Sequence, residues 1–179
     1  MNSRIAPPLL TSGWLNTSEP LDVSDFRGRV LVIEAFQMLC PGCVSQGLPQ
    51  AQRIAQTFPA DQVAVIGLHT VFEHHEVQGT RDALAAFVHE YRLSFPVGID
   101  RQNGRLPATM TAYEMQGTPT LVVIDRSGAR RFQQFGHVDD LRLGSIIGML
   151  LRETAGGVER PSEDGATCNE VGCPVPSGS

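Results

Sequence analysis

Cys40 and Cys43 stand two residues apart, with Pro41 and Gly42 between them, and they are the residues of this sequence best suited to chemistry. Two thiols at this spacing can close into a disulfide ring and reopen without a change of fold. The attacking species in such exchange is a thiolate, and a helix N-terminus favours negative charge. Because helical spacing of apolar residues begins beside the pair, Cys40 is the predicted nucleophile. Cys43, one turn into the helix, is the predicted resolving thiol.

Cys168 and Cys173 are the other two cysteines, and they allow two interpretations. They could form a mobile dithiol that relays electrons to the main pair, since exchange needs only access and a thiolate. They could also be incidental residues of a passive segment. A zinc site at the main pair would need a second pair of ligands, and four residues separate Cys168 from Cys173 without an evident scaffold. We therefore predict no metal bound by the cysteines.

Three histidines, His69, His74 and His75, form a cluster with Glu73 and Glu76. Such a group could bind a metal ion. It follows a predicted strand and precedes a predicted helix, which indicates a solvated loop near the carboxyl end of the sheet. A loop in that place could also contact partners, so both interpretations stay open.

The elements that must position the cysteines alternate along the chain. Val30–Phe36 is an almost unbroken apolar run rich in β-branched residues, as in a strand buried on both faces. A helix follows the pair, then a second strand, a helix capped by Thr80, a short strand, a hairpin and a last helix capped by Asp139. The expected bounds of the later strands are Val63–Leu68, Phe95–Ile99, Leu121–Ile124 and Arg130–Phe135. This order predicts a single α/β domain over residues 1–154, with a central mixed β-sheet and helices on both faces.

Residues 155–179 are rich in Gly, Pro, Ser and acidic residues, which predicts a flexible tail carrying Cys168 and Cys173. The net charge of -5 does not suggest a basic face, so nucleic acid is not an expected partner. No run approaches the ~20 apolar residues of a membrane span, and residues 1–10 lack the apolar core of a secretory signal. We expect a cytoplasmic monomer without membrane contact, or a periplasmic or other extracytoplasmic protein if a signal has been removed.

Several segments together resemble the thioredoxin superfamily, and within it the TlpA/ResA-type thiol–disulfide oxidoreductases (redoxin domains). They are Leu21–Gly28, the strand into Cys40-Pro-Gly-Cys43, Phe95–Asp100, and Tyr113–Thr120 followed by Leu121–Asp125. The resemblance covers roughly residues 20–152. It implies a thioredoxin-like fold with a redox-active disulfide and no other cofactor. The implied partners are proteins that carry disulfides, together with a thiol reductant or oxidant that recycles the pair.

The segment Gly117-Thr118-Pro119-Thr120 resembles the cis-proline loop of this family, which faces the cysteines in the fold. Proline suits that place because a cis peptide before it costs only about 0.5–1 kcal/mol and because it has no N–H to donate. The resemblance implies that the Thr118 backbone pairs with an extended substrate, and that Pro41, Gly42, Thr118 and Pro119 contact the substrate. An ordinary turn proline before a strand is the alternative.

Glu34 lies six residues before Cys40, where thioredoxins carry a buried acid. Burial disfavours the charged carboxyl and raises its pKa, so Glu34 is the predicted proton relay for Cys43. A glutamate at a sheet edge facing water, or one paired with an Arg, is the alternative. Thioredoxins often place a Lys near this acid, but all 14 basic residues of this chain are Arg.

Two other departures from the family pattern concern the surroundings of the pair. Leu39 stands where the family usually has Trp, so the docking surface differs, and the only Trp is Trp14. The helix proline, Pro49, falls nine positions after Cys40 instead of the usual eight. We expect a one-residue bulge at Gly47 to absorb this shift.

The leading functional hypothesis is a thiol–disulfide oxidoreductase that acts on protein partners through Cys40 and Cys43, with reduction preferred over oxidation because the expected cytoplasmic location is reducing. A peroxiredoxin-like thiol peroxidase is the first alternative. Its signature needs Thr or Ser three residues before the reactive cysteine and Pro seven before, but Gln37 and Ile33 stand there for Cys40, and Cys40 and Phe36 for Cys43. The second alternative is a redox-sensing or metal-carrying adaptor that docks partners without turnover.

Overall fold

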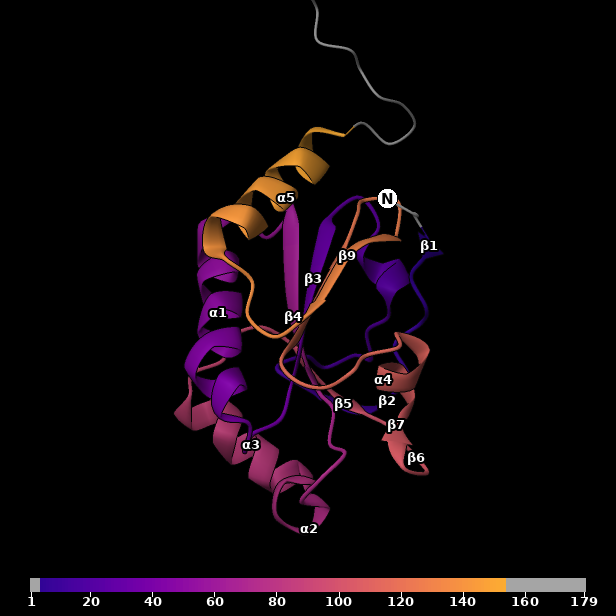
Figure 1. Cartoon of the computed structure of the whole chain (residues 1–179), viewed down its shortest axis with the longest axis vertical. Helices are drawn as coiled ribbons and strands as arrows, with labels where there is room; N and C mark the ends of the chain where they lie inside the picture. The colour runs from indigo at the N-terminus through magenta and orange to yellow at the C-terminus, as the bar shows by residue number, and fades with distance from the viewer. Residues whose placement is uncertain (1–3, 154–179) are drawn as a thin grey trace, which may run out of the picture.

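The computed structural model describes residues 4–153, and a mixed β-sheet runs through their centre (Figure 1). The strands of this sheet are β1 (Arg4–Ile5), β2 (Thr11–Leu15), β3 (Val30–Phe36), β4 (Val63–His69), β5 (Val97–Asp100), β8 (Thr120–Ile124) and β9 (Ala129–Phe135). Their spatial order is β1-β9-β8-β3-β4-β5-β2. β3, β4 and β5 run parallel, and the other neighbours pair antiparallel. A short ribbon, β6 (Gln102–Asn103) with β7 (Leu106–Pro107), stands apart.

Helices lie on both faces of the sheet, as the sequence predicts (Figure 1). The helices are α1 (Leu48–Thr57), α2 (His75–Gln78), α3 (Arg81–Glu90), α4 (Ala108–Ala112) and α5 (Asp140–Arg152), with a 3-10 turn η1 (Val23–Phe26) and a π-helical turn η2 (Cys43–Gly47). α1, α3 and α5 pack on one face, whereas η1, α4 and the segment before β2 pack on the other.

β3 lies in the middle of the sheet and every one of its seven residues is buried. Alternate residues point to opposite faces of a strand, so Val32 and Phe36 join the core under α1 while Ile33 and Ala35 join the core under α4. Glu34 therefore points to the face that carries α1 and Cys43. Cys40 follows the carboxyl end of β3, which ends at Phe36.

Both predicted helix caps are present. The Thr80 side chain accepts a hydrogen bond from the Ala83 N–H, and the Asp139 side chain accepts from Leu141 and Arg142. The strand expected at Phe95–Ile99 begins two residues later, at Val97, because Phe95 turns into the core and Pro96 has no N–H for the ladder. These differences leave the predicted order of elements intact.

The predicted tail, residues 155–179, lies outside the described residues, as do Cys168 and Cys173. The boundary at residue 154 and the relay role of these cysteines stay predictions. Among residues 4–153, no helix has both the length and the apolar character needed to cross a membrane.

Candidate active site

The two cysteines of the pair differ in exposure. Helical residues begin at Pro41, directly after Cys40, so Cys40 stands at the N-terminus and half-buried, whereas Cys43 is fully buried. The Cys43 N–H donates to the Cys40 Sγ at 3.2 Å, and the Cys40 thiol donates to the Thr118 carbonyl at 3.5 Å. A backbone N–H on Cys40 Sγ stabilises the thiolate at that atom.

The Cys43 thiol resists ionisation in the reduced protein. Burial is the main cause that raises its pKa, and its hydrogen bond and charge interaction with Cys40 raise it further. Hydrogen bonds from the Gln37 backbone and the Thr118 side chain act in the opposite direction but do not offset burial. Cys43 therefore needs a proton acceptor before it can attack a disulfide.

Pro119 faces the cysteine pair across the mouth of the site. The Thr118–Pro119 bond is cis, as the resemblance implies. A Cβ on Gly42 would lie 3.4 Å from the Pro119 Cδ, so the two residues are in contact. The Gly136 N–H donates to the Pro119 carbonyl at 2.8 Å, which ties the loop to the end of β9. Thr118 and Pro119 are half-buried, so the surface of this loop stays within reach of a partner.

Glu34 is buried in the sheet, with 1% of its surface exposed, beside the redox helix, by which we mean the continuous helix from Pro41 to Thr57 that carries Cys43. Its Oε1 has no hydrogen-bond partner within residues 4–153. Burial first, and then the charge of Cys40, raise the pKa of Glu34 well above its usual value. The alternative of a water-facing edge glutamate is wrong, because β3 is an interior strand. No Arg pairs with it in the described part of the chain.

Two glutamines that the sequence did not single out hold the loop before Cys40. Gln37 and Gln78 are each 1% exposed. The Gln78 side chain accepts from the Leu39 N–H at 3.1 Å and donates to the Gln37 Oε1 at 3.0 Å. It also donates to the Glu73 carbonyl at 2.9 Å. The α2 segment is thereby attached to the residue that directly precedes Cys40.

The histidine cluster of the sequence is not one group in the structure. His69 is 2% exposed and packs against the Phe36 ring at 5.3 Å, and burial lowers its pKa to about 4. His74 and His75 lie on the surface at the start of α2. Within residues 4–153 no three His, Cys, Asp or Glu side chains are placed to hold a metal ion.

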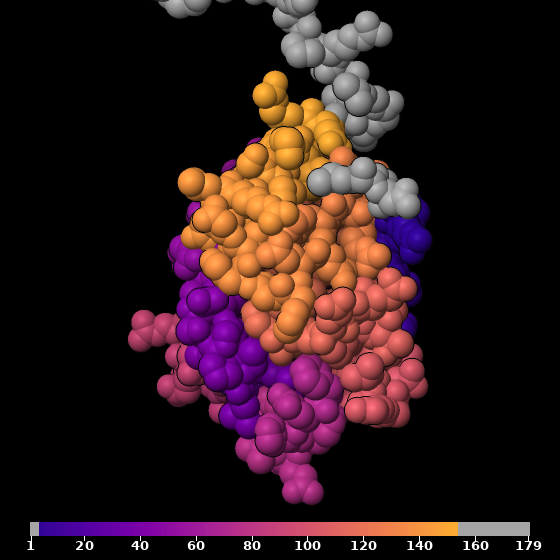
Figure 2. Space-filling model, viewed as in Figure 1, coloured from indigo at the N-terminus to yellow at the C-terminus, as the bar shows by residue number. Residues whose placement is uncertain are grey.

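The segments that border Cys40 carry exposed apolar side chains. Leu39 is 53% exposed and Val77 is 64% exposed. The hydrogen bond from Leu39 to Gln78 brings these two segments together. The space-filling view shows the magenta chain around α2 against the violet chain that leads into α1 (Figure 2). Phe135, 53% exposed, packs against Gly117 on the side of the cis-proline loop. The accessible sulfur thus lies among apolar groups that a polypeptide could cover.

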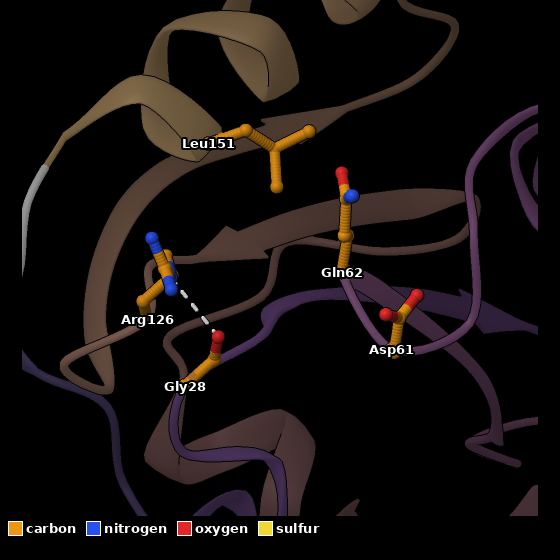
Figure 3. Close-up of a pocket in the computed structure, with 5 residues that line it drawn as sticks. All are labelled: Gly28, Asp61, Gln62, Arg126 and Leu151. Atoms are coloured by element: carbon orange, nitrogen blue, oxygen red, sulfur yellow. Dashed lines mark hydrogen bonds between the residues drawn. The ribbon is translucent and has the colours of Figure 1, made fainter.

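A hollow of about 240 Å³ lies at the opposite end of the sheet (Figure 3). Gly28 and Gln62 line it just before β3 and β4 begin, whereas Cys40 follows the carboxyl end of β3. The Arg126 Nε donates to the Gly28 carbonyl at 3.0 Å. This hollow holds neither thiol nor buried acid, so the candidate active site is the surface around Cys40.

A family model described as AhpC/TSA family matches residues 8–131, a span that includes the cysteine pair and the cis-proline loop. The chain belongs to the AhpC/TSA family. Among solved structures, a thioredoxin-like superfamily protein is 54% identical, with a TM-score of 0.81 over 83% of this chain and 97% of the other. A thiol-disulfide isomerase from Corynebacterium glutamicum is 49% identical, with a TM-score of 0.79 over 83% and 98%.

A putative thiol:disulfide interchange protein DsbE from Chlorobium tepidum is 20% identical, with a TM-score of 0.68 over 83% of this chain and 96% of the other, and shows a shared fold. No curated protein matches the chain significantly. These likenesses confirm that this AhpC/TSA member has a thioredoxin-like fold and belongs to the thioredoxin superfamily. They leave the roles of its individual residues as predictions.

Proposed function

We propose that the protein is a thiol–disulfide oxidoreductase that reduces disulfides of protein partners through Cys40 and Cys43. The observation that carries the proposal is the asymmetry of the pair: Cys40 is half-buried and its sulfur accepts a backbone N–H, whereas Cys43 is fully buried. Two relatives near 50% identity, a thioredoxin-like superfamily protein and a thiol-disulfide isomerase, support the same chemistry.

The proposed reaction has two exchange steps. The Cys40 thiolate attacks one sulfur of the partner disulfide, a Cys40–partner bond forms, and the other partner sulfur leaves as a thiolate. Cys43 then loses its proton to Glu34 and attacks the Cys40 sulfur, which releases the second partner thiolate. The partner gains two electrons and, from solvent and Glu34, two protons. The Cys40–Cys43 disulfide formed is reduced again by an external thiol.

The partner is proposed to bind as an extended segment along the cis-proline loop. The Thr118 backbone would pair with it, and Pro41, Gly42 and Pro119 would contact it on either side of the reacting sulfurs. The exposed Pro41 and half-buried Gly42 and Thr118 support this placement. No cofactor besides the redox-active disulfide is required by the proposed reaction.

A trapping experiment tests the proposal and the assignment of the two thiols. We expect the protein to accelerate reduction of insulin by dithiothreitol, and Cys40→Ser and Cys43→Ser each to abolish the acceleration. Cys43→Ser should accumulate a mixed disulfide between Cys40 and the partner, identified by mass spectrometry of the linked peptides. Equal trapping by Cys40→Ser contradicts the assigned roles. Rapid consumption of hydrogen peroxide by Cys43→Ser, without insulin reduction by the wild type, would favour the peroxidase alternative.

The direction of electron flow is tested separately by the equilibrium with glutathione. In a reductase, the Cys40–Cys43 disulfide should be harder to reduce at equilibrium than the disulfide of oxidised glutathione. We expect most of the pair to be reduced only at a large excess of reduced over oxidised glutathione. A pair that stays reduced in mildly oxidising buffer would assign the protein an oxidising role.

A further inference from the structure

The helix that carries the cysteines contains one π-helical turn, at Cys43–Gly47. The Leu48 N–H donates to the Cys43 carbonyl, five residues back instead of the four of an α-helix. The turn thus holds one extra residue between the cysteines and Pro49. Gly47, the last residue of the turn, is buried and faces the sheet.

Gly47 is required by space and not by backbone conformation. Its φ of -60° and ψ of -56° are ordinary helical values that any residue adopts. A Cβ at this position, however, would overlap the Glu34 Oε1, and would lie 3.0 Å from the Glu34 Cδ and 3.1 Å from the Pro119 Cβ. The Glu34 carboxyl therefore occupies the space that a side chain at position 47 would need.

A glycine inside a helix destabilises it relative to alanine, so its presence here needs a reason. Elsewhere in the fold the chain has room for alanine: a Cβ on Gly144, in α5, would meet no atom within 4 Å. At Gly47 an alanine would push the carboxyl aside or displace the cis-proline loop. Gly47 of the redox helix thus lies close to both the buried Glu34 carboxyl and Pro119 of the cis-proline loop.

We propose that Gly47 is a positioning residue, whose missing side chain at the π-helical turn holds open the place from which the Glu34 carboxylate accepts the Cys43 proton. This inference rests on the proposed function and extends it from Cys43 and Glu34 to the turn between them. The proton leaves the Cys43 sulfur for a Glu34 oxygen, and the Cys43–Cys40 bond forms as the Cys40–partner bond breaks.

Few groups that can titrate lie around Glu34 among residues 4–153. The charge of Cys40 raises the pKa of Glu34, Cys43 lies on the same face of the sheet, and His69 lies at the end of the neighbouring strand β4. Burial lowers the pKa of His69 to about 4, so its imidazole is a weaker base than usual and a poor acceptor for the Cys43 proton. The other neighbouring strand, β8, contributes no ionisable side chain. A pH dependence of Cys43 attack near neutral pH is therefore assigned to Glu34 and the cysteines.

The test follows the two steps separately with Ellman's reagent, a small chromogenic disulfide. Reduced protein in which Cys168 and Cys173 are replaced by Ser reacts in a stopped-flow instrument. The first coloured thiolate reports attack by Cys40, and the second reports attack by Cys43 on the mixed disulfide. The rate of the second phase is measured against pH for the wild-type pair, Gly47→Ala, Glu34→Gln, the double variant and the control Gly144→Ala.

Glu34→Gln keeps the size of the side chain, so it separates proton transfer from packing. We expect Glu34→Gln to slow the second phase by about tenfold or more and to remove its acidic inflection. Gly47→Ala should do the same by a similar factor, whereas Gly144→Ala should have no effect. The second-phase rate of the double variant should be within about twofold of that of Glu34→Gln. The amide introduced by Glu34→Gln does not accept the Cys43 proton in either position, so displacing it should cost no further rate.

The inference is overturned if the effects of Gly47→Ala and Glu34→Gln on the rate of the second phase multiply in the double variant. If Gly47→Ala slows Glu34→Gln as much as it slows the wild type, Gly47 acts through packing against Pro119 or the helix. An unaltered second phase in Gly47→Ala overturns it as well. A wild-type pair that releases no second thiolate refutes the proposed function itself, and this outcome is distinct from both.

If Gly47→Ala does not fold, the double variant Gly47→Ala/Glu34→Ala provides the decisive measurement. The shortened side chain vacates the volume that the new methyl group needs. We expect this variant to fold and to unfold at a higher temperature than Gly47→Ala. A double variant that remains unfolded, while Glu34→Ala alone folds, contradicts the steric contact on which the inference depends.

Discussion

The buried amide of Gln78 offers a quantitative test of how the loop before Cys40 is held. Gln78→Met keeps the length of the side chain but removes three hydrogen bonds, with the Leu39 N–H, the Gln37 Oε1 and the Glu73 carbonyl. The Gln37 Oε1 would keep only a long contact with the Phe72 N–H, at 3.4 Å. The substitution therefore leaves polar groups in the interior with poor partners or none.

The expected loss of stability follows from the cost of such groups. A buried donor or acceptor left without a partner costs about 1–3 kcal/mol. The hydrogen bond to the Gln37 Oε1 is buried and the one from the Leu39 N–H is part-buried, so Gln78→Met should lower the free energy of unfolding by about 3 kcal/mol. For a domain of this size that corresponds to a fall in Tm of about 6–12 °C.

Urea unfolding of the reduced protein measures this loss, with Gln52→Met as the matched control. The Gln52 side chain also donates two hydrogen bonds, to the Tyr91 and Arg92 carbonyls at 3.2 Å, but at an exposed site where water can replace them. We expect the control to lose less than about 1 kcal/mol. A Gln78→Met protein that is no less stable than the control would refute the role of the buried amides.

Three further predictions concern other parts of the molecule. Trp14 packs on Gly98 on the sheet face opposite Cys43, so the emission spectra of the reduced and oxidised protein should coincide, while unfolding should change the emission. Burial raises the pKa of Asp125, but hydrogen bonds, chiefly from Ser127, outweigh burial and hold that pKa below its usual value. Its stabilising effect is therefore present above about pH 4 and is lost as pH falls through the lower folded-state pKa, so urea unfolding should show wild type and Asp125→Asn differing more at pH 6 than at pH 3. Leu39→Ser should slow insulin reduction about three- to tenfold while leaving attack on Ellman's reagent unchanged, because only a polypeptide covers the exposed Leu39 side chain; equal effects on both substrates would contradict this.

The parts of the site that the sequence predicts are those with a local signature. The spacing of the cysteine pair places a helix after Cys40, and the displaced Pro49 predicts an irregular turn at Gly47. The π-helical turn confirms that irregularity. Proline supplies the physical reason, since Pro49 has no N–H to donate to the carbonyl four residues earlier and a regular helix would be interrupted there in any case.

The parts that the sequence leaves unpredicted depend on contacts between distant segments. Helix α4 has only five residues, and the N–H groups of its second and third residues, Thr109 and Met110, donate to the Asp100 carboxylate at 2.8 and 2.9 Å. Nothing in the local pattern indicates that cap. Gln37 and Gln78 are likewise ordinary surface residues by type, and their burial follows from a hydrogen bond that spans 41 positions.

The absence of lysine from this chain bears on the pKa of Glu34. A cation beside this carboxyl would favour its charged form and lower its pKa. In the described residues the causes that act on Glu34 are burial and the charge of Cys40, and both raise its pKa. Because the second cause disappears when Cys40 enters a disulfide, the proton affinity of Glu34 falls as the pair is oxidised. Among the described residues, burial thus sets most of the proton affinity of Glu34, and the charge of Cys40 adds to it.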